Sequence, residues 1–181
     1  MRTLNELQSM QADLPAPRDG AGTVHLIVLR LGDGEHDVPK TAQLDVELGV
    51  VGDRWSVGEG RLRGKQVTLM NHAVAELVAD GKPMHMSGDN FLVDIDLSEA
   101  ALPVGTLLEL GTAILRVSEE PHRGCKRFAE RFGKDAVRWL NDKKRRPLRL
   151  RGVNCSVERS GDVSLGGRVG ACPPDFALAA E

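Results

Sequence analysis

The chain has 181 residues and a formal net charge of −2 at pH 7, with 41% hydrophobic and 28% charged residues. This profile is typical of one globular domain, and the near-neutral charge argues against a nucleic-acid-binding protein, which would carry a strongly basic surface. No apolar run is long enough to span a bilayer, and aromatic residues make up only 3% of the chain, too few for a platform on which single-stranded nucleic acid stacks.

The first segment, residues 1–22, is polar and ends in a stretch rich in proline and glycine. It predicts an N-terminal extension, with room for a short helix, followed by a linker. The folded domain is expected over 23–172, and 173–181 is expected to be a C-terminal tail. Within the domain, β-prone runs bounded by turn residues predict the first three strands, over 24–29, 42–48 and 65–70.

After these strands the hydrophobic period changes to that of a helix. Asn71 is placed to cap a helix that Gly81 closes, with apolar residues on one face. Residues 91–96 return to a strand pattern. Two further β-prone runs then flank Gly111-Thr112, and two runs flank Ser160-Gly161-Asp162, which predicts two hairpins. Between the hairpins, a helical pattern extends from Cys125 to Asn141, with Gly133 as a break.

Many short strands with two local hairpins and only two helical segments predict a mostly β fold, a barrel or sandwich of largely antiparallel strands. The chain lacks the strand–helix alternation of a doubly wound parallel sheet. It has three cysteines with no C-x-x-C pair, and its first residues lack the apolar stretch of a signal peptide. An odd number of unpaired cysteines is typical of a reducing compartment, so we expect a cytoplasmic protein without a disulfide scaffold.

Cys125 lies in a segment that combines a thiol, an imidazole and three basic side chains, Pro121-His122-Arg123-Gly124-Cys125-Lys126-Arg127. A thiol among basic side chains at the start of a helix favours the thiolate, with a pKa that can fall from about 8.5 to about 3.5–7.5. His122 is close enough in sequence to accept the proton, so Cys125 and His122 are the candidate catalytic residues. The alternative is that Cys125 is a small apolar filler, which rarely stands between Pro-His-Arg-Gly and Lys-Arg.

The segment from His122 to Asn141 resembles the signature of stand-alone MOSC domains, relatives of the C-terminal domain of molybdenum-cofactor sulfurase. Four further elements resemble the family's motifs in the expected order. They are Gly49-Val50-Val51-Gly52-Asp53-Arg54-Trp55, Gly88-Asp89-Asn90, Leu102-Pro103-Val104-Gly105 and Leu150-Arg151-Gly152-Val153.

This resemblance implies a MOSC-type β-barrel with a few flanking helices, and it implies that Cys125 carries a persulfide or ligates the metal of a molybdenum cofactor. A thiolate is a soft ligand that suits such a metal. Sulfur transfer, or molybdenum-dependent reduction of N-hydroxylated compounds, are the activities implied. Because the 22 residues before the domain are too few for a domain that binds pyridoxal phosphate, the partner is expected to be a separate protein. It would be a cysteine desulfurase or other sulfur donor, or a redox partner. Gly124 stands where some members have proline before the cysteine.

The same resemblance implies a pocket lined by Asp53, Arg54, Asp89 and Asn90, with Arg123 and Lys126 also binding the cofactor or tuning the thiol. Acidic and amide side chains in glycine turns also stabilise the turn itself. The sequence favours this interpretation as much as it favours the pocket. The basic cluster that follows the helical segment is best explained as a solvated helix end; the alternative is an anchor for a phosphorylated cofactor. It comprises Lys143, Lys144, Arg145, Arg146, Arg149 and Arg151.

Two other functions remain open from the residues alone. One is a non-catalytic module that binds a small anionic ligand in the same pocket. The other is a free-standing cysteine-thiol enzyme, such as a hydrolase that uses Cys125 and His122. A zinc site built from His122, Cys125, Cys155 and Cys172 matches no common ligand spacing, and the apolar neighbours of Cys155 predict a core position.

Overall fold

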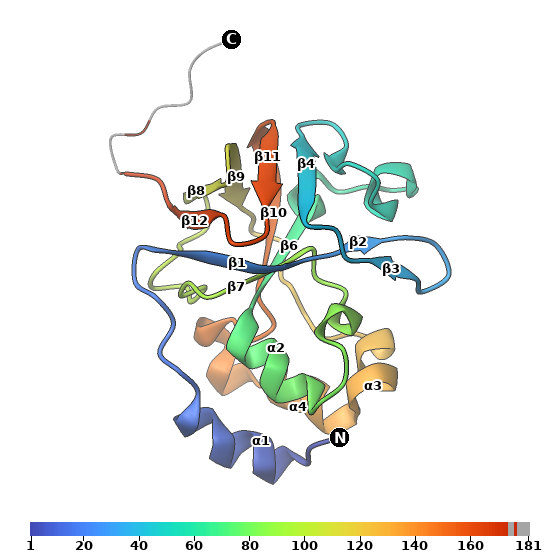
Figure 1. The fold of residues 1–181 in the computed structure, drawn as a ribbon. Helices are drawn as coiled ribbons and strands as arrows, with labels where there is room; N and C mark the ends of the chain where they lie inside the picture. The colour runs from blue at the N-terminus through green and yellow to red at the C-terminus, as the bar shows by residue number, and fades with distance from the viewer. Residues whose placement is uncertain (174–175, 177–181) are drawn as a thin grey trace.

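The fold is a closed β-barrel with helices on one side, as a computed structural model shows for residues 1–173 and 176 (Figure 1). The seven barrel strands follow the order β1-β12-β8-β9-β10-β6-β7. Their bounds are β1 Ala21–Ile27, β6 Val67–Asn71, β7 Phe91–Val93, β8 Leu107–Leu110, β9 Ala113–Val117, β10 Val153–Arg159 and β12 Arg168–Ala171. The predicted mostly β barrel is thereby confirmed. The predicted tail over 173–181 falls largely outside the described residues.

All neighbouring barrel strands are antiparallel except β6 and β7, which are parallel. Parallel neighbours require a crossover connection, and here it contains α2 (His72–Ala79). The Asn71 side chain caps α2 as predicted, since its Oδ1 accepts hydrogen bonds from the backbone N–H groups of Ala73 and Val74. The predicted hairpin around Gly111-Thr112 is also confirmed, with Leu110 opposite Ala113.

The second predicted hairpin, around Ser160-Gly161-Asp162, is wrong. Residues 161–164 form β11 (Gly161–Ser164), which pairs with β4 (Thr41–Asp45) and not with β10. The reason is that both edges of β10 are already occupied, by β6 and by β9. The chain therefore turns out of the barrel at Ser160 and joins a small sheet with the order β11-β4-β5, where β5 is Gly49–Val50.

The helices form a second layer beneath the barrel (Figure 1). They are α1 (Leu4–Met10), α2, α3 (Lys126–Phe132) and α4 (Lys134–Leu140), and the expected break between α3 and α4 lies at Gly133. Their apolar faces share one core with Leu92 and Met70, separate from the barrel interior. Leu7 of α1 is fully buried in this layer, so the helical part of the N-terminal extension packs against the domain. Among the described residues, no helix is both long and apolar enough to cross a membrane.

Short 3₁₀ helices and one two-stranded ribbon complete the described structure. The ribbon pairs β2 (Leu29–Arg30) with β3 (His36–Asp37). The 3₁₀ helices are η1 Gln11–Asp13, η2 Arg54–Val57, η3 Arg63–Lys65, η4 Met84–Ser87 and η5 Lys143–Leu148.

Candidate functional site

Cys125 is the residue immediately before α3, and it is exposed. Its backbone is extended, and its carbonyl accepts a hydrogen bond from the Ala129 N–H, the first such bond of the helix. The segment 118–125 brings the thiol here directly from the end of β9. The prediction that Cys125 opens a helix is therefore confirmed.

Asn141, just after α4, fixes the residue that precedes the thiol. Its Oδ1 accepts a hydrogen bond from the Gly124 N–H at 2.9 Å, and its Nδ2–H donates to the Gly124 carbonyl at 3.0 Å. Gly124 also lies against Val137, whose methyl groups would be 3.3 Å from a Cβ at this position. The sequence motif included Asn141, but nothing in the sequence alone indicated this contact.

The His122 side chain is 12% exposed and lies beside Asp89. Its Nε2 lies 3.5 Å from Oδ1 of Asp89, and its Nδ1 is buried without a hydrogen-bond partner among the described residues. Burial, with the positive charges of Arg151, Arg30 and Lys65, holds the pKa of His122 well below 6.5, so the ring is neutral at pH 7. No hydrogen bond joins this ring to Cys125 in the described part of the chain, so the structure does not bring the two candidate catalytic residues together.

Asp53 and Asn90 form one buried network, and its function is to hold Arg30. Two nitrogens of the Arg30 guanidinium each lie 2.8 Å from one oxygen of the Asp53 carboxylate, and the Asn90 Nδ2–H donates to the same carboxylate at 2.9 Å. Burial raises the pKa of Asp53, but the hydrogen bonds and charge of Arg30 outweigh it and hold that pKa below its usual value. With these oxygens engaged, Asp53 and Asn90 line neither of the two pockets that the described residues form beside them.

Asp89 holds Arg151 in the same way as Asp53 holds Arg30. One terminal nitrogen of Arg151 lies 2.7 Å from both oxygens of the Asp89 carboxylate, and its guanidinium also stacks over the Phe128 ring at 4.6 Å. Both side chains of this ion pair are buried. Two predicted pocket residues, Asp53 and Asp89, are thus anchors for arginines that do line pockets.

The first pocket, which we call the Trp55 pocket, has a volume of about 580 Å³. Its wall includes five cationic side chains and a single carboxylate, Glu59; the cations are Arg30, Arg54, Arg61, Lys65 and Arg123. Arg30 is paired with Asp53 and Lys65 with Glu120, whereas the other three have no ion pair among the described residues. Burial lowers the pKa of Arg54, and the nearby charges of Arg30 and of Arg127 on α3 lower it further. The pocket therefore has unmatched positive charge on the side that leads to α3 and Cys125.

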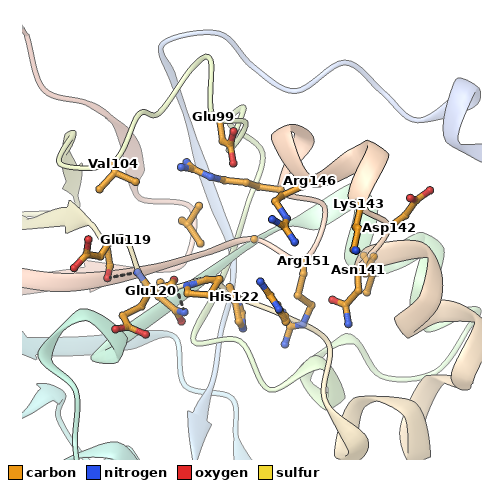
Figure 2. A pocket seen from close by; sticks show the side chains of 18 residues that line it. Glu99, Val104, Glu119, Glu120, His122, Asn141, Asp142, Lys143, Arg146 and Arg151 are labelled. Atoms are coloured by element: carbon orange, nitrogen blue, oxygen red, sulfur yellow. Dashed lines mark hydrogen bonds between the residues drawn. The ribbon is translucent and has the colours of Figure 1, made fainter.

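A second pocket, which we call the Arg149 pocket, has a volume of about 400 Å³. It lies on the other side of the segment 121–123, because Pro121, His122, Arg123 and Asn154 line both pockets. Figure 2 shows Arg146, Arg151 and Lys143 around this hollow, with His122 and Asn141. Part of the basic cluster seen in the sequence therefore lines a pocket and is not only a solvated helix end.

The remaining predicted site residues are spread over the surface and the core. Arg54 and Arg123 line the Trp55 pocket, whereas the Lys126 side chain is 92% exposed and lies 4.0 Å from Glu130. Cys155 is fully buried in the barrel core, as predicted. Within the described residues, no three His, Cys, Asp or Glu side chains are grouped so that they could hold a metal ion.

Comparison with known proteins agrees with this architecture. The family model for the MOSC domain matches residues 65–170. The structure is similar to the YuaD protein from Bacillus subtilis, with a TM-score of 0.57 and 17% identity over 82% of this chain and 94% of that one. It is also similar to YiiM from Escherichia coli, with a TM-score of 0.56 and 18% identity over 86% of this chain and 72% of that one. For YiiM from Geobacillus stearothermophilus the TM-score is 0.52, and the identity is 14% over 84% of this chain and 75% of that one. No curated protein matches the chain.

Proposed function

Because this chain belongs to the MOSC domain family, we propose that it binds the molybdenum cofactor, with Cys125 as a thiolate ligand to the metal. The phosphate of the cofactor would bind in the Trp55 pocket. The observation that supports this most is the unmatched charge of Arg54, Arg61 and Arg123 in a pocket with one carboxylate. Arginine side chains in such surroundings suit a phosphate, which accepts several hydrogen bonds from guanidinium groups.

The residues present fit this cofactor. A single exposed thiol, without a cluster of other protein donors, suits a metal that brings most of its own ligands. The molybdenum cofactor does so through its own sulfur atoms, and a cysteine thiolate is the matching soft donor. When bound, the cofactor would supply two-electron redox chemistry, as in the reduction of N-hydroxylated compounds.

The residues of the chain have separate roles in this proposal. Asn141 fixes Gly124, and so sets where the thiol stands. Asp53 orients Arg30 at the wall of the Trp55 pocket, and Arg54 and Arg61 bind the anion. Electrons would come from a separate redox protein.

A second candidate is a sulfur carrier, and the exposure of Cys125 favours it, because a partner protein can reach the thiol. The Cys125 thiolate would attack the terminal sulfur of a persulfide on a cysteine desulfurase. The sulfur–sulfur bond of the donor breaks, the donor thiolate leaves, and Cys125 carries the persulfide. This exchange is balanced without an external oxidant.

The first test is the metal and pterin content of protein purified from a host that makes the molybdenum cofactor. We expect near-equimolar molybdenum and pterin in the wild type and in the control Cys172→Ser, and loss of molybdenum in Cys125→Ser. Arg54→Gln and Arg61→Gln should lower the pterin content, whereas Arg168→Gln, on the exposed surface of β12, should not. Wild-type protein without molybdenum and pterin would overturn the cofactor proposal.

The second test is mass spectrometry after incubation with a cysteine desulfurase and cysteine. The carrier function predicts a reducible gain of about 32 Da on the Cys125 peptide, which is absent from Cys125→Ser and present in Cys172→Ser. An unmodified wild type would contradict it. Full function of Cys125→Ser in cells would instead indicate a non-catalytic binding module.

A further inference from the structure

The Arg149 pocket has the size of a small-molecule site. Its volume of about 400 Å³ lies within the usual range for such sites, about 300–1,000 Å³. Apolar side chains form part of its wall, and charged groups come from η5 and from the segment between η5 and β10 (Figure 2). The pocket is separated from the Trp55 pocket by the segment 121–123, so one ligand does not fill both.

The wall of this pocket carries a half-buried positive charge, that of Arg149. Arg149 is half-buried, donates a hydrogen bond to the Leu102 carbonyl, and has no ion pair among the described residues. Burial lowers the pKa of its guanidinium, and the charge of Glu99 offsets this only in part.

Two further nitrogen atoms in the pocket wall lack partners. The Nε of Arg151 and the Nδ1 of His122 are both buried, and neither makes a hydrogen bond within the described residues. Buried polar atoms are almost always hydrogen-bonded, so an exception requires an explanation, such as a ligand. An acceptor oxygen of a bound molecule would supply a partner for the Nε–H of Arg151, whereas the Nδ1 of His122, whose Nε2 faces the Asp89 carboxylate, would accept from a donor group of the ligand.

Two of the four carboxylates in the pocket wall are already paired with cations. Asp142 is paired with Arg145, and Glu120 with Lys65. Glu99 and Glu119 are exposed and have no ion pair among the described residues, and the charge of Glu99 acts on Arg149. Arg146 and Lys143 are exposed and have no ion pair in the described part of the chain, so the unpaired cations of the pocket wall outnumber its unpaired carboxylates.

We infer that the Arg149 pocket is a second ligand site, which binds a small phosphate monoester through Arg149 and Arg146. The three phosphate oxygens match two guanidinium groups and the Lys143 ammonium. The organic part of the ligand would lie against Val104, Leu140 and Val153. This inference does not rest on the cofactor proposal, because the three cations that would bind the phosphate, Arg149, Arg146 and Lys143, do not line the Trp55 pocket.

The test is a titration of ¹⁵N-labelled protein with phenyl phosphate, followed by the chemical shifts of backbone amides. We expect saturable shifts at Glu119, Asn141 and Gly152. Arg149→Gln should weaken binding about tenfold or more, as expected for the loss of one hydrogen bond to a charged group. Because Arg146 is exposed and its replacement cannot disturb the core, Arg146→Gln provides a second variant with the same expected direction.

The controls separate this site from general electrostatics and from the Trp55 pocket. Lys144→Gln removes a charge from the same 3₁₀ helix outside the pocket and should leave the affinity unchanged. Arg61→Gln should also leave it unchanged. Shifts confined to Gly58 and Gly60 of the Trp55 pocket, an absence of saturable shifts, or an equal loss of affinity in Lys144→Gln would overturn the inference.

Discussion

Replacing Asn141 with alanine tests whether the position of the reactive thiol depends on one side chain. The substitution removes two hydrogen bonds, one from the Gly124 N–H and one to the Gly124 carbonyl, and leaves the apolar contact between Gly124 and Val137. No other described side chain is hydrogen-bonded to Gly124. The segment before Cys125 should therefore become mobile while α3 and α4 remain folded.

The expected magnitude follows from the exposure of these bonds. A typical hydrogen bond contributes about 0.5–1.5 kcal/mol net, and because water can replace both partners here, we take the lower end for each. The sum is about 1 kcal/mol, which corresponds to a Tm lower by about 2–4 °C. Exchange of the Gly124 amide through local opening should become about fivefold faster.

Hydrogen exchange of the Gly124 amide, measured by NMR, is the direct assay, with molybdenum content as the functional readout. Asn141→Asp retains the acceptor for the Gly124 N–H. Its Gly124 amide should therefore exchange at a rate between those of the wild type and Asn141→Ala. Asn5→Ala, an exposed residue of α1, is the matched control. Alkylation of Cys125 should keep its rate in Asn141→Ala, since the thiol is already exposed. If the Gly124 amide exchanges equally slowly in Asn141→Ala, Asn141 does not position the thiol.

Three further predictions concern packing, pH and the thiols. Leu7→Ala should lower the free energy of unfolding in urea by about 2–5 kcal/mol, because Leu7 is fully buried in the helical layer; exposed Leu48→Ala should change it by less than about 0.5 kcal/mol. The stability should fall as the pH drops below about 6.5, because the unfolded chain protonates His122 while the folded chain, with its lowered pKa, does not. His122→Gln should reduce this slope by up to about 1.4 kcal/mol per pH unit; an unchanged profile in urea would contradict the assignment. Iodoacetamide should label Cys125 in the folded protein and Cys155 only after denaturation, because burial raises the pKa of the Cys155 thiol to about 12; peptide mass spectrometry on native protein decides this.

Local sequence signals predicted the parts of the fold that local contacts determine. The β8–β9 hairpin follows from Gly111-Thr112, and the start of α2 follows from Asn71. The closure of the barrel is different, since β1 pairs with both β12 and β7, far along the chain. No periodicity encodes such a pairing, and the same limitation explains the error at Ser160, where the strand pattern was right but the partner strand was β4.

The roles of the candidate site residues depend on contacts that the sequence does not show. The motif resemblance identified Asp53 and Asp89, yet their partners Arg30 and Arg151 are 23 and 62 residues away. A sequence pattern does not show which cation a buried carboxylate will meet. Asp53 and Asp89 were therefore predicted to line a pocket, whereas in the structure they bind the arginines that do so.

These buried pairs decide which charges remain available for ligands. Removing one partner of a buried ion pair costs about 3–5 kcal/mol, because the other charge is left uncompensated. The charges of Arg30 and Arg151 are thus already balanced within the fold, by Asp53 and Asp89. The cations without such a partner lie on both sides of the segment 121–123: Arg54 and Arg61 in one pocket, and Arg146 and Arg149 in the other. Because this segment leads directly to Cys125, an anion on either side would bind next to the backbone that positions the thiol.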